Sequence, residues 1–130
     1  MQAVKKIDKP WGYELLWAQT AQYAGKVLHI NRGHKLSLQY HERKHETMFL
    51  YSGRMLLILE DDNGVLREHH LSAGQAHHIP AGRRHRMVAL DGDCEVLEVS
   101  TNDLYDVVRV DDAYGRVAMC DERPSVSSGI

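Results

Sequence analysis

Short segments with the character of β-strands recur about every ten residues through the first hundred positions, and this spacing most limits what the chain can fold into. Turn-forming residues separate the segments, among them Asn63–Gly64, Pro80–Ala81–Gly82 and Asp91–Gly92–Asp93. No segment before residue 101 keeps the 3.6-residue period of an amphipathic helix over three turns. The pattern therefore predicts an all-β fold, an antiparallel sandwich or barrel.

The strand assignments rest on apolar and alternating runs. They cover residues 26–31, 36–40, 47–51, 55–60, 65–71, 85–90 and 95–100, with a hairpin turn at 60–64. We expect residues 9–16 to form a loop that runs into a short strand or edge segment, and residues 17–24 to form a helical turn. Residues 102–110 are expected to form a short helix or an extended arm. We expect one domain over residues 1–120, with 1–24 as its N-terminal arm and edge segment, and a flexible, Ser-rich tail over 121–130.

Composition narrows the class of protein. Hydrophobic residues make up 43% of the 130 residues, which is enough for one packed core, and the charged fraction of 26% argues against disorder. A formal net charge of −2 gives no electrostatic footprint for nucleic acid, and no apolar run approaches the roughly 20 residues that span a bilayer. The N-terminal segment lacks the apolar core of a signal peptide, and Cys94 and Cys120 form no CxxC pair. We therefore expect a cytoplasmic protein with reduced thiols and with neither nucleic-acid nor membrane partners.

The stretch Gly33–Gly53 carries a polar, histidine-rich middle between two apolar runs. Gln39 and His41 are two residues apart, so on a strand their side chains leave the same face. Glu46 follows a charged loop and can return to the same cavity on the next strand, and His85 comes after a Pro-Ala-Gly turn. Two imidazoles, a carboxylate and an amide oxygen suit one divalent metal ion, with zinc as our first choice and Mn, Fe, Co or Ni as alternatives.

The same positions match two sequence motifs of the cupin superfamily, which this chain resembles. The first motif, G(X)5HXH(X)3–4E(X)6G, matches residues Gly33–Gly53, with Gln39 in place of the first histidine. The second, G(X)5PXG(X)2H(X)3N, matches residues 74–89, with Ala89 in place of the asparagine. The resemblance implies a double-stranded β-helix, which is a jelly-roll-like barrel that holds its metal ion inside.

More narrowly, the chain resembles the isomerase domain of type II phosphomannose isomerases, usually the C-terminal part of a bifunctional mannose-1-phosphate guanylyltransferase. The segments that carry this resemblance are KPWGYE (9–14), LSLQYH (36–41), Glu46, HIPAGRRHR (78–86), LEVS (97–100), DVVR (106–109) and DAYGR (112–116). The resemblance implies a metal-dependent sugar-phosphate isomerase that interconverts mannose 6-phosphate and fructose 6-phosphate through an enediolate. A sugar phosphate is accordingly the expected small-molecule partner.

The isomerisation needs a base and a binding site for phosphate. If Val96, Glu98 and Ser100 face inward, Glu98 is our preferred base, with the alternative that it only supports a ligand histidine. We assign substrate binding to Lys35, Lys44, Arg109 and Arg116, since cationic side chains suit phosphate oxygens. Lys35 is included because it falls on the strand face of Gln39 and His41. Arg109, which matches the family's ending, is also assigned to the catalytic set.

Three departures from the family pattern leave the substrate open. The family usually has a histidine and a tryptophan after the glutamate, where this chain has Thr47 and Met48. It usually has arginine at Lys44 and glutamine at Ser100. Another metal-dependent cupin enzyme, such as an epimerase or oxygenase, and a non-catalytic sugar-binding cupin are therefore the alternatives. Small cupins commonly pair through sheet edges, so the resemblance also implies a homodimer.

Overall fold

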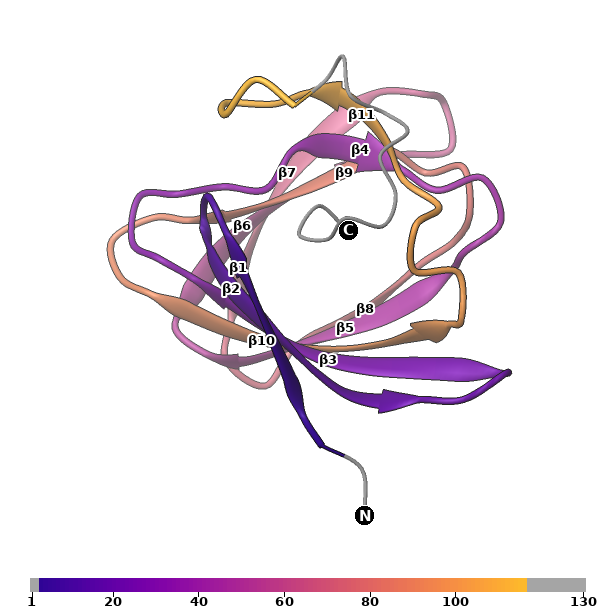
Figure 1. Cartoon of the computed structure of the whole chain (residues 1–130). Helices are drawn as coiled ribbons and strands as arrows, with labels where there is room; N and C mark the ends of the chain where they lie inside the picture. The colour runs from indigo at the N-terminus through magenta and orange to yellow at the C-terminus, as the bar shows by residue number, and fades with distance from the viewer. Residues whose placement is uncertain (1–2, 117–130) are drawn as a thin grey trace.

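The structure is a computed structural model, and it describes residues 3–116. Within this range the chain forms eleven β-strands in two antiparallel sheets that face each other (Figure 1). The all-β prediction is confirmed, and the described residues contain no helix that is long and apolar enough to cross a membrane. The domain boundary predicted at residue 120, the tail at 121–130 and Cys120 lie outside the described residues.

The larger sheet has six strands in the order β1-β2-β3-β10-β5-β8, and the smaller has five in the order β11-β4-β9-β6-β7. In chain order the strands are β1 (Lys5–Lys9), β2 (Gly12–Gln19), β3 (Tyr23–Ile30), β4 (Leu38–Tyr40), β5 (Glu46–Ser52), β6 (Arg54–Glu60), β7 (Leu66–Ser72), β8 (Ala76–Ile79), β9 (His85–Ala89), β10 (Cys94–Thr101) and β11 (Val108–Asp111). From β3 to β11, consecutive strands alternate between the two sheets except at the β6–β7 hairpin, as expected for the jelly-roll-like fold.

The predicted hairpin turn at residues 60–64 is present between β6 and β7. The side chain of Asp61 accepts hydrogen bonds from the backbone N–H groups of Asn63 and Val65, at 2.8 and 2.9 Å. Its other oxygen accepts a hydrogen bond from Arg67 Nε at 2.9 Å. This turn chemistry is local in sequence, which is why the residue types alone predict it.

The helical turn predicted for residues 17–24 is wrong. β2 continues to Gln19, and a tight turn leads into β3, in which the Thr20 side chain accepts hydrogen bonds from the N–H groups of Gln22 and Tyr23. The Trp17 ring lies on Gly25 of β3, so closely that a Cβ atom there would come within 2.7 Å of it. Pairing with β3 therefore decides the conformation of this segment, and local sequence does not show it.

The segment 102–110 was predicted as a short helix or an extended arm, and the helical alternative is wrong. After a series of turns, β11 pairs with β4, so that Val108 lies opposite Tyr40 and Arg109 opposite Gln39. This pairing brings a segment more than sixty residues away to the edge of the smaller sheet.

The core fills one part of the interior, and charged residues occupy the other. Inward positions of β5 read Glu46, Met48 and Leu50, and those of β10 read Ser100, Glu98 and Val96 on the antiparallel neighbour. The buried apolar cluster contains Trp11, Leu28, Ile30, Leu36, Met48, Leu50, Met55, Leu57, Leu59, Ile79, Met87, Ala89, Cys94 and Val96. Three of its members are methionines, Met48, Met55 and Met87, and Cys94 is a buried free thiol.

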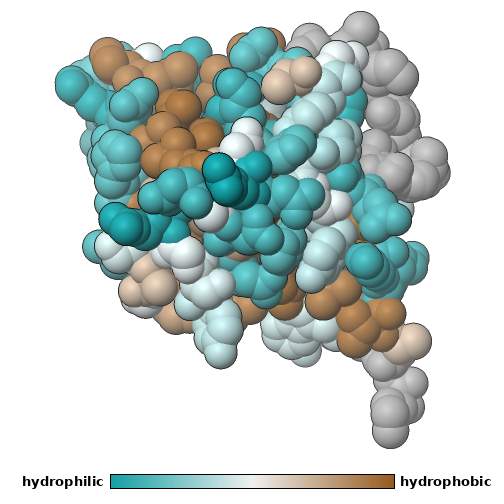
Figure 2. Space-filling model, turned by 90° about the vertical axis from the view of Figure 1, so that its left-hand side faces the viewer, coloured by the Kyte–Doolittle hydropathy of each residue, from teal (hydrophilic) through white to brown (hydrophobic). Residues whose placement is uncertain are grey.

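The outer surface is mixed in character. The face shown in Figure 2 is mostly hydrophilic, with hydrophobic side chains gathered towards its upper left and lower right. Several large apolar side chains are exposed among the described residues, including Trp17, Tyr51 and Val99.

Candidate metal centre

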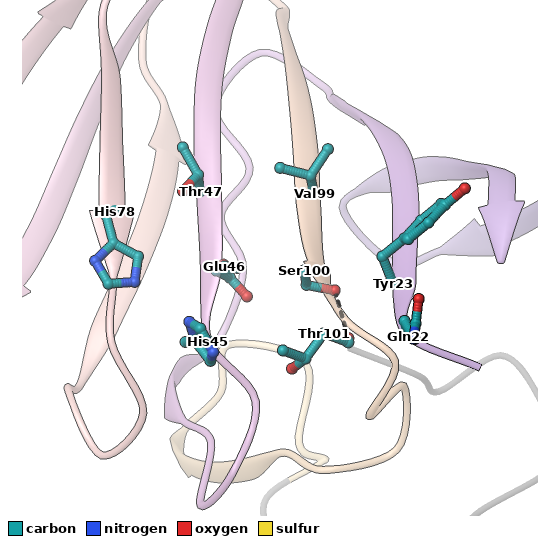
Figure 3. Close-up of a pocket in the computed structure, with 9 residues that line it drawn as sticks. All are labelled: Gln22, Tyr23, His45, Glu46, Thr47, His78, Val99, Ser100 and Thr101. Atoms are coloured by element: carbon teal, nitrogen blue, oxygen red, sulfur yellow. Dashed lines mark hydrogen bonds between the residues drawn. The ribbon is translucent and has the colours of Figure 1, made fainter. Parts of the chain in front are cut away.

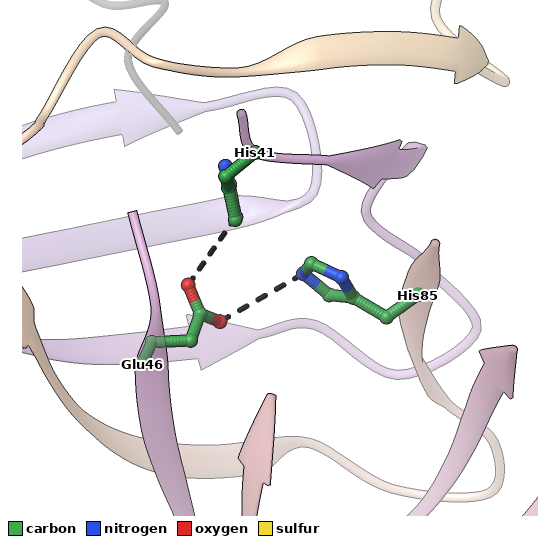
Figure 4. Close-up of side chains that lie close together, drawn as sticks. All are labelled: His41, Glu46 and His85. Atoms are coloured by element: carbon green, nitrogen blue, oxygen red, sulfur yellow. Dashed lines mark ion pairs between the residues drawn. The ribbon is translucent and has the colours of Figure 1, made fainter. Parts of the chain in front are cut away.

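Three predicted ligands meet in the interior. His41 directly follows β4, Glu46 opens β5 and His85 opens β9, so each stands where a strand begins or ends. His41 Nε2 lies 3.3 Å from one Glu46 oxygen and His85 Nε2 lies 3.8 Å from the other (Figure 4). All three side chains are 2% exposed, and their ligand atoms lie within 4.8 Å of one another.

Backbone carbonyls fix the orientation of both imidazoles. His41 Nδ1 lies 2.6 Å from the carbonyl oxygen of Asp106, and His85 Nδ1 lies 2.9 Å from that of Arg83. Since a carbonyl only accepts, each Nδ1 carries the proton and each Nε2 keeps its lone pair. Burial also lowers the pKa of His85, which favours the neutral ring that a metal ion requires.

These atoms fit a divalent metal ion. His41 Nε2, His85 Nε2 and Glu46 Oε1 are buried and make no hydrogen bond with the part of the chain that the structure describes. Glu46 Oε1 has an ion pair with Lys44 Nζ at 3.2 Å, whereas the two imidazole nitrogens have lone pairs that accept no hydrogen bond from the described residues. Buried polar atoms without hydrogen bonds are costly, and a cation bound between the two nitrogens and the carboxylate would satisfy them. Nitrogen and carboxylate donors in such a set bind first-row divalent ions. Metal ions therefore have a candidate site formed by His41, Glu46 and His85.

Gln39, the fourth predicted ligand, lies beside this cluster on the smaller sheet. It is 2% exposed and is flanked by His85 on β9 and Arg109 on β11. Its amide oxygen accepts a hydrogen bond from Ser37 Oγ at 2.6 Å. Gln39 as a metal ligand stays a prediction, and in this arrangement Ser37 already holds the oxygen that would coordinate.

Asp106 organises the loop between the first two ligands, and sequence reasoning missed it. Its carboxylate accepts hydrogen bonds from the backbone N–H groups of Glu42, Arg43 and Lys44, at 3.0, 2.7 and 2.9 Å. Its carbonyl oxygen is also the partner of His41 Nδ1. One residue from the distant DVVR segment therefore positions both ends of the loop that joins His41 to Glu46.

Buried charges of alternating sign continue from the metal centre across the inner face of the six-stranded sheet. Lys44 Nζ lies 3.2 Å from both Glu46 Oε1 and Glu98 Oε2. Glu98 on β10 stands opposite Lys26 on β3, and Lys26 Nζ lies 3.4 Å from Glu14 Oε1 on β2. We call these five residues, Glu46, Lys44, Glu98, Lys26 and Glu14, the charge row.

The charge row shifts the acid–base properties of its members. Burial alone would lower the pKa of Lys44, but Glu98 and Glu46 outweigh it and raise that pKa above its usual value. Burial, reinforced by the charge of Glu46, raises the pKa of Glu98. Burial also opposes ionisation of Glu46, yet Lys44 and the two histidines hold its pKa well below the usual range. Glu46 is thus ready to bind a cation, and Glu98 is disposed to take up a proton.

Glu98 does not support a ligand histidine. Glu98 accepts a hydrogen bond from Lys44 Nζ, and the Nδ1 atoms of His41 and His85 donate to backbone carbonyl oxygens. The alternative role considered for Glu98 is therefore wrong, because its basis was a hydrogen bond that the backbone makes instead.

The predicted substrate-binding cations are placed differently from one another. Lys44 is 1% exposed and clamped between two carboxylates, so its ammonium is not presented to a phosphate group. Lys35 is only half-buried and lies opposite Val88. Its neighbours Leu36 and Ser37 are both buried, so side chains do not alternate strictly between the inside and the outside here. The placement of Lys35 in the cavity, which depended on that alternation, is therefore wrong.

The two arginines lie in or near the interior. Arg109 is 6% exposed beside Gln39, and Arg116 forms a two-pronged ion pair with Asp112 through Nε and Nη2, at 2.9 and 3.0 Å. Arg116 Nη1 is buried and makes no hydrogen bond with residues 3–116. Both remain candidates for binding an anionic group.

Three further charged residues of the interior were missed from the sequence. Lys9 at the end of β1 is 7% exposed, Glu14 within β2 is 1% exposed, and Lys26 within β3 is 3% exposed. A signal existed for Lys26, since it shares the parity of the core residues Leu28 and Ile30 in a strand that the sequence predicts. Glu14 belongs to the KPWGYE segment, in which the sequence pattern carries no signal of a buried charge.

A separate hollow of about 300 Å³ lies at the end of the six-stranded sheet (Figure 3). Its lining residues are Gln22, Tyr23, His45, Glu46, Thr47, His78, Val99, Ser100 and Thr101. His41 and His85 do not line it, and the Glu46 side chain is 2% exposed. The hollow therefore borders the metal centre through Glu46 alone.

A cupin-domain family model matches residues 26–100, more than half of the chain. The chain belongs to the cupin family. The match spans both motifs, and therefore all the candidate metal ligands and Glu98.

Solved structures similar to the cupin chain agree with this fold. KdgF from Halomonas sp. has a TM-score of 0.64 and 22% identity, over 78% of this chain and 86% of that one. Oxalate decarboxylase from Bacillus subtilis has a TM-score of 0.74 and 16% identity, over 82% of this chain and 30% of that one. The capsular polysaccharide assembling protein CapF from Staphylococcus aureus has a TM-score of 0.68 and 19% identity, over 82% of this chain and 32% of that one.

This cupin therefore spans about a third of the last two proteins, and at these identities the similarity concerns the fold. Mn(II) centres are named for Bacillus subtilis oxalate decarboxylase. Among curated proteins, no sequence matches this one.

Proposed function

We propose that this cupin is a metal-dependent sugar-phosphate isomerase of the mannose 6-phosphate/fructose 6-phosphate type. The observation that carries the proposal is the pairing of a three-ligand cluster with a buried carboxyl group, Glu98, held nearby by Lys44. An aldose–ketose isomerase needs both an electrophile for the sugar oxygens and a base for the carbon-bound proton. The sequence resemblance to type II phosphomannose isomerases supports the choice of substrate.

The ligands of the ion are His41, Glu46 and His85, and the sequence predicts Gln39 as the fourth. Zinc is our first choice, and Mn(II), as named for oxalate decarboxylase, is the next. Once bound, a divalent ion supplies Lewis-acid polarisation of the substrate oxygens.

The residues of the chain have the following roles. The Glu98 carboxylate takes the proton from C2 of the open-chain aldose and returns it to C1, while the hydroxyl proton of O2 passes to O1. Burial raises the pKa of Glu98, which suits a group that must accept and then release a proton. Lys44 orients this carboxylate and bridges it to Glu46, which offsets the repulsion between the two negative charges. Arg109, which is 6% exposed, binds the phosphate together with Arg116 in this proposal.

Solvent exchange tests the proposal. Protein stripped with EDTA is reloaded with Zn²⁺, Mn²⁺, Fe²⁺, Co²⁺ or Ni²⁺ and incubated with mannose 6-phosphate in D₂O. We expect metal-dependent formation of fructose 6-phosphate with deuterium at the transferred position, and loss of both in Glu98→Gln. Full turnover without metal, or no turnover with any of the five ions, would overturn the proposal.

The homodimer stays a prediction from the sequence, and light scattering of the purified protein tests it. The cytoplasmic location likewise stays a prediction.

A further inference from the structure

The end of the charge row remote from the metal centre has no role in the chemistry above. Glu14 on β2 and Lys26 on β3 are 1% and 3% exposed, and their side chains form an ion pair of 3.4 Å. Burying two charges is costly, and replacing such a pair with apolar residues is often neutral or stabilising. The pair therefore needs a reason beyond stability.

The Glu14 carboxylate is incompletely bonded. Oε1 faces Lys26, while Oε2 is buried and receives no hydrogen bond from residues 3–116. Lys26 has three N–H donors, and its ion pair with Glu14 engages one of its sides. Burial lowers the pKa of Lys26, and Glu14 only partly offsets this, so the ammonium is poorly solvated by its surroundings. A buried acceptor that receives no hydrogen bond from residues 3–116 therefore lies beside a buried ammonium group.

The pair shares the interior with the metal centre. Lys26 stands opposite Glu98 across the β3–β10 pairing, and Glu98 connects through Lys44 to Glu46. A substrate that has its reacting carbons next to Glu98 therefore has Lys26 and Glu14 as neighbours along the same sheet face.

The chemistry of the pair selects the group it binds. A hydroxyl group both donates and accepts, so it can give its proton to Glu14 Oε2 and accept one from Lys26. A phosphate or carboxylate group would be repelled by Glu14. The anionic end of a substrate belongs instead with the guanidinium groups of Arg109 and Arg116.

We propose that Glu14 and Lys26 form a hydroxyl-binding subsite that selects a polyhydroxylated chain, as in a sugar phosphate or a sugar acid. The inference rests on the proposed function in one respect, namely that substrate enters the interior beside Glu98. It adds that recognition depends on the sugar hydroxyl groups, and that Glu14 determines this specificity.

Binding measurements on metal-loaded protein test the subsite. Calorimetry compares mannose 6-phosphate, gluconate and inorganic phosphate as ligands of the wild type, of Glu14→Gln and of the control Glu68→Gln, whose side chain is exposed on β7. Losing one charge-assisted hydrogen bond should weaken binding of the hydroxylated ligands about ten-fold or more in Glu14→Gln. Inorganic phosphate should bind within about two-fold of the wild type, and Glu68→Gln should match the wild type throughout.

A second variant covers the case in which Glu14→Gln fails to fold. Glu14→Leu combined with Lys26→Met removes both charges, retains apolar volume and is expected to bind metal normally. Its affinity for mannose 6-phosphate and gluconate should fall as much as that of Glu14→Gln. Unchanged affinity for mannose 6-phosphate and gluconate in the variants, equal weakening of all three ligands, or no binding of either hydroxylated ligand to the wild type would overturn the inference.

The outcomes separate this inference from the proposed isomerase. Glu14-dependent binding without exchange at C2 supports the subsite and refutes the isomerase. Exchange at C2 with the same KM in wild type and Glu14→Gln refutes the subsite and leaves the isomerase standing.

Discussion

Replacing Lys44 with methionine is the perturbation that tests the charge row most sharply. Lys44 is 1% exposed, and its ammonium lies 3.2 Å from a carboxylate oxygen on each of two sides. Lys44→Met leaves Glu46 and Glu98 buried, adjacent and without their shared cation. Removing one partner of a buried ion pair typically destabilises a protein by about 3–5 kcal/mol. Because burial already raises the pKa of Glu98, this carboxyl group can take up a proton, so we expect the lower end, about 3 kcal/mol.

The assay is urea unfolding of metal-free protein at pH 7, with the free energy of unfolding taken from the fitted midpoint and slope. Arg43→Met is the matched control, since it removes a neighbouring cation whose side chain is 70% exposed and 3.7 Å from Asp103. A surface pair of this kind contributes less than about 1 kcal/mol. Adding Glu98→Gln to Lys44→Met should recover at least about 1 kcal/mol, because it removes one of the two stranded charges.

A free energy of unfolding for Lys44→Met within about 1 kcal/mol of the wild type would refute this reasoning, since it would mean that the interior tolerates both carboxylates without a cation. Equal losses in Lys44→Met and Arg43→Met would refute it as well. Either result would also remove the basis for giving Lys44 a positioning role.

Three other predictions concern separate parts of the fold. Asp106→Ala should weaken Zn²⁺ binding about ten-fold or more in a competition titration, because it releases the loop that joins His41 to Glu46; unchanged affinity would contradict the role of Asp106. Burial lowers the pKa of Lys9 to about 7 in the folded protein, from its usual value of 10.5. The buried charge therefore destabilises the fold fully below pH 7, and this destabilisation disappears as the pH rises from 7 to the pKa of the unfolded chain. Lys9→Met should therefore be more stable than wild type by up to about 4 kcal/mol at pH 7, with the gain vanishing near pH 10.5, whereas exposed Lys5→Met should show no such trend in urea unfolding. Gly12→Ala should lower the free energy of unfolding by more than about 3 kcal/mol, because its Cβ would come within 1.9 Å of the His29 carbonyl oxygen at a φ of 152°. Gly33→Ala has open space around its Cβ and should lower the free energy of unfolding by about 1–2 kcal/mol. Equal losses in the two variants would rule out the clash.

The metal ligands are predictable because their signals are local. The spacing of His41, Glu46 and His85 within two short motifs implies three groups near strand ends, and the structure brings them together. The strands and turns that carry them follow from residue type and alternation in the same way, as the Asp61 turn shows.

Features that depend on distant pairing are not predictable in this way. Trp17–Ala24 contains no turn signal strong enough to reveal that it folds back on Gly25, and its conformation comes from the β2–β3 pairing. Lys35 is misplaced because a rule of alternation fails where Leu36 and Ser37 are both buried. The local pattern cannot show such an irregularity in advance.

The same limit applies to the charges of the interior. From the sequence, Lys44 is expected to be a solvated loop residue or a phosphate ligand. Its ammonium contacts Glu98 only because β10 pairs with β5. Glu14 and Lys26 are twelve residues apart and meet because β2 and β3 form a hairpin. The sequence therefore locates the metal centre but not the charges that would tune its chemistry.

The most direct test of the account is a metal titration of protein stripped with EDTA, followed by calorimetry for Zn²⁺ and Mn²⁺. We predict one ion per chain for the wild type and for the control His70→Ala, whose side chain is exposed on β7, and at least about a hundred-fold weaker binding for His85→Ala. A wild type that binds neither ion stoichiometrically, or a His85→Ala variant that binds as tightly as the control, would contradict the account.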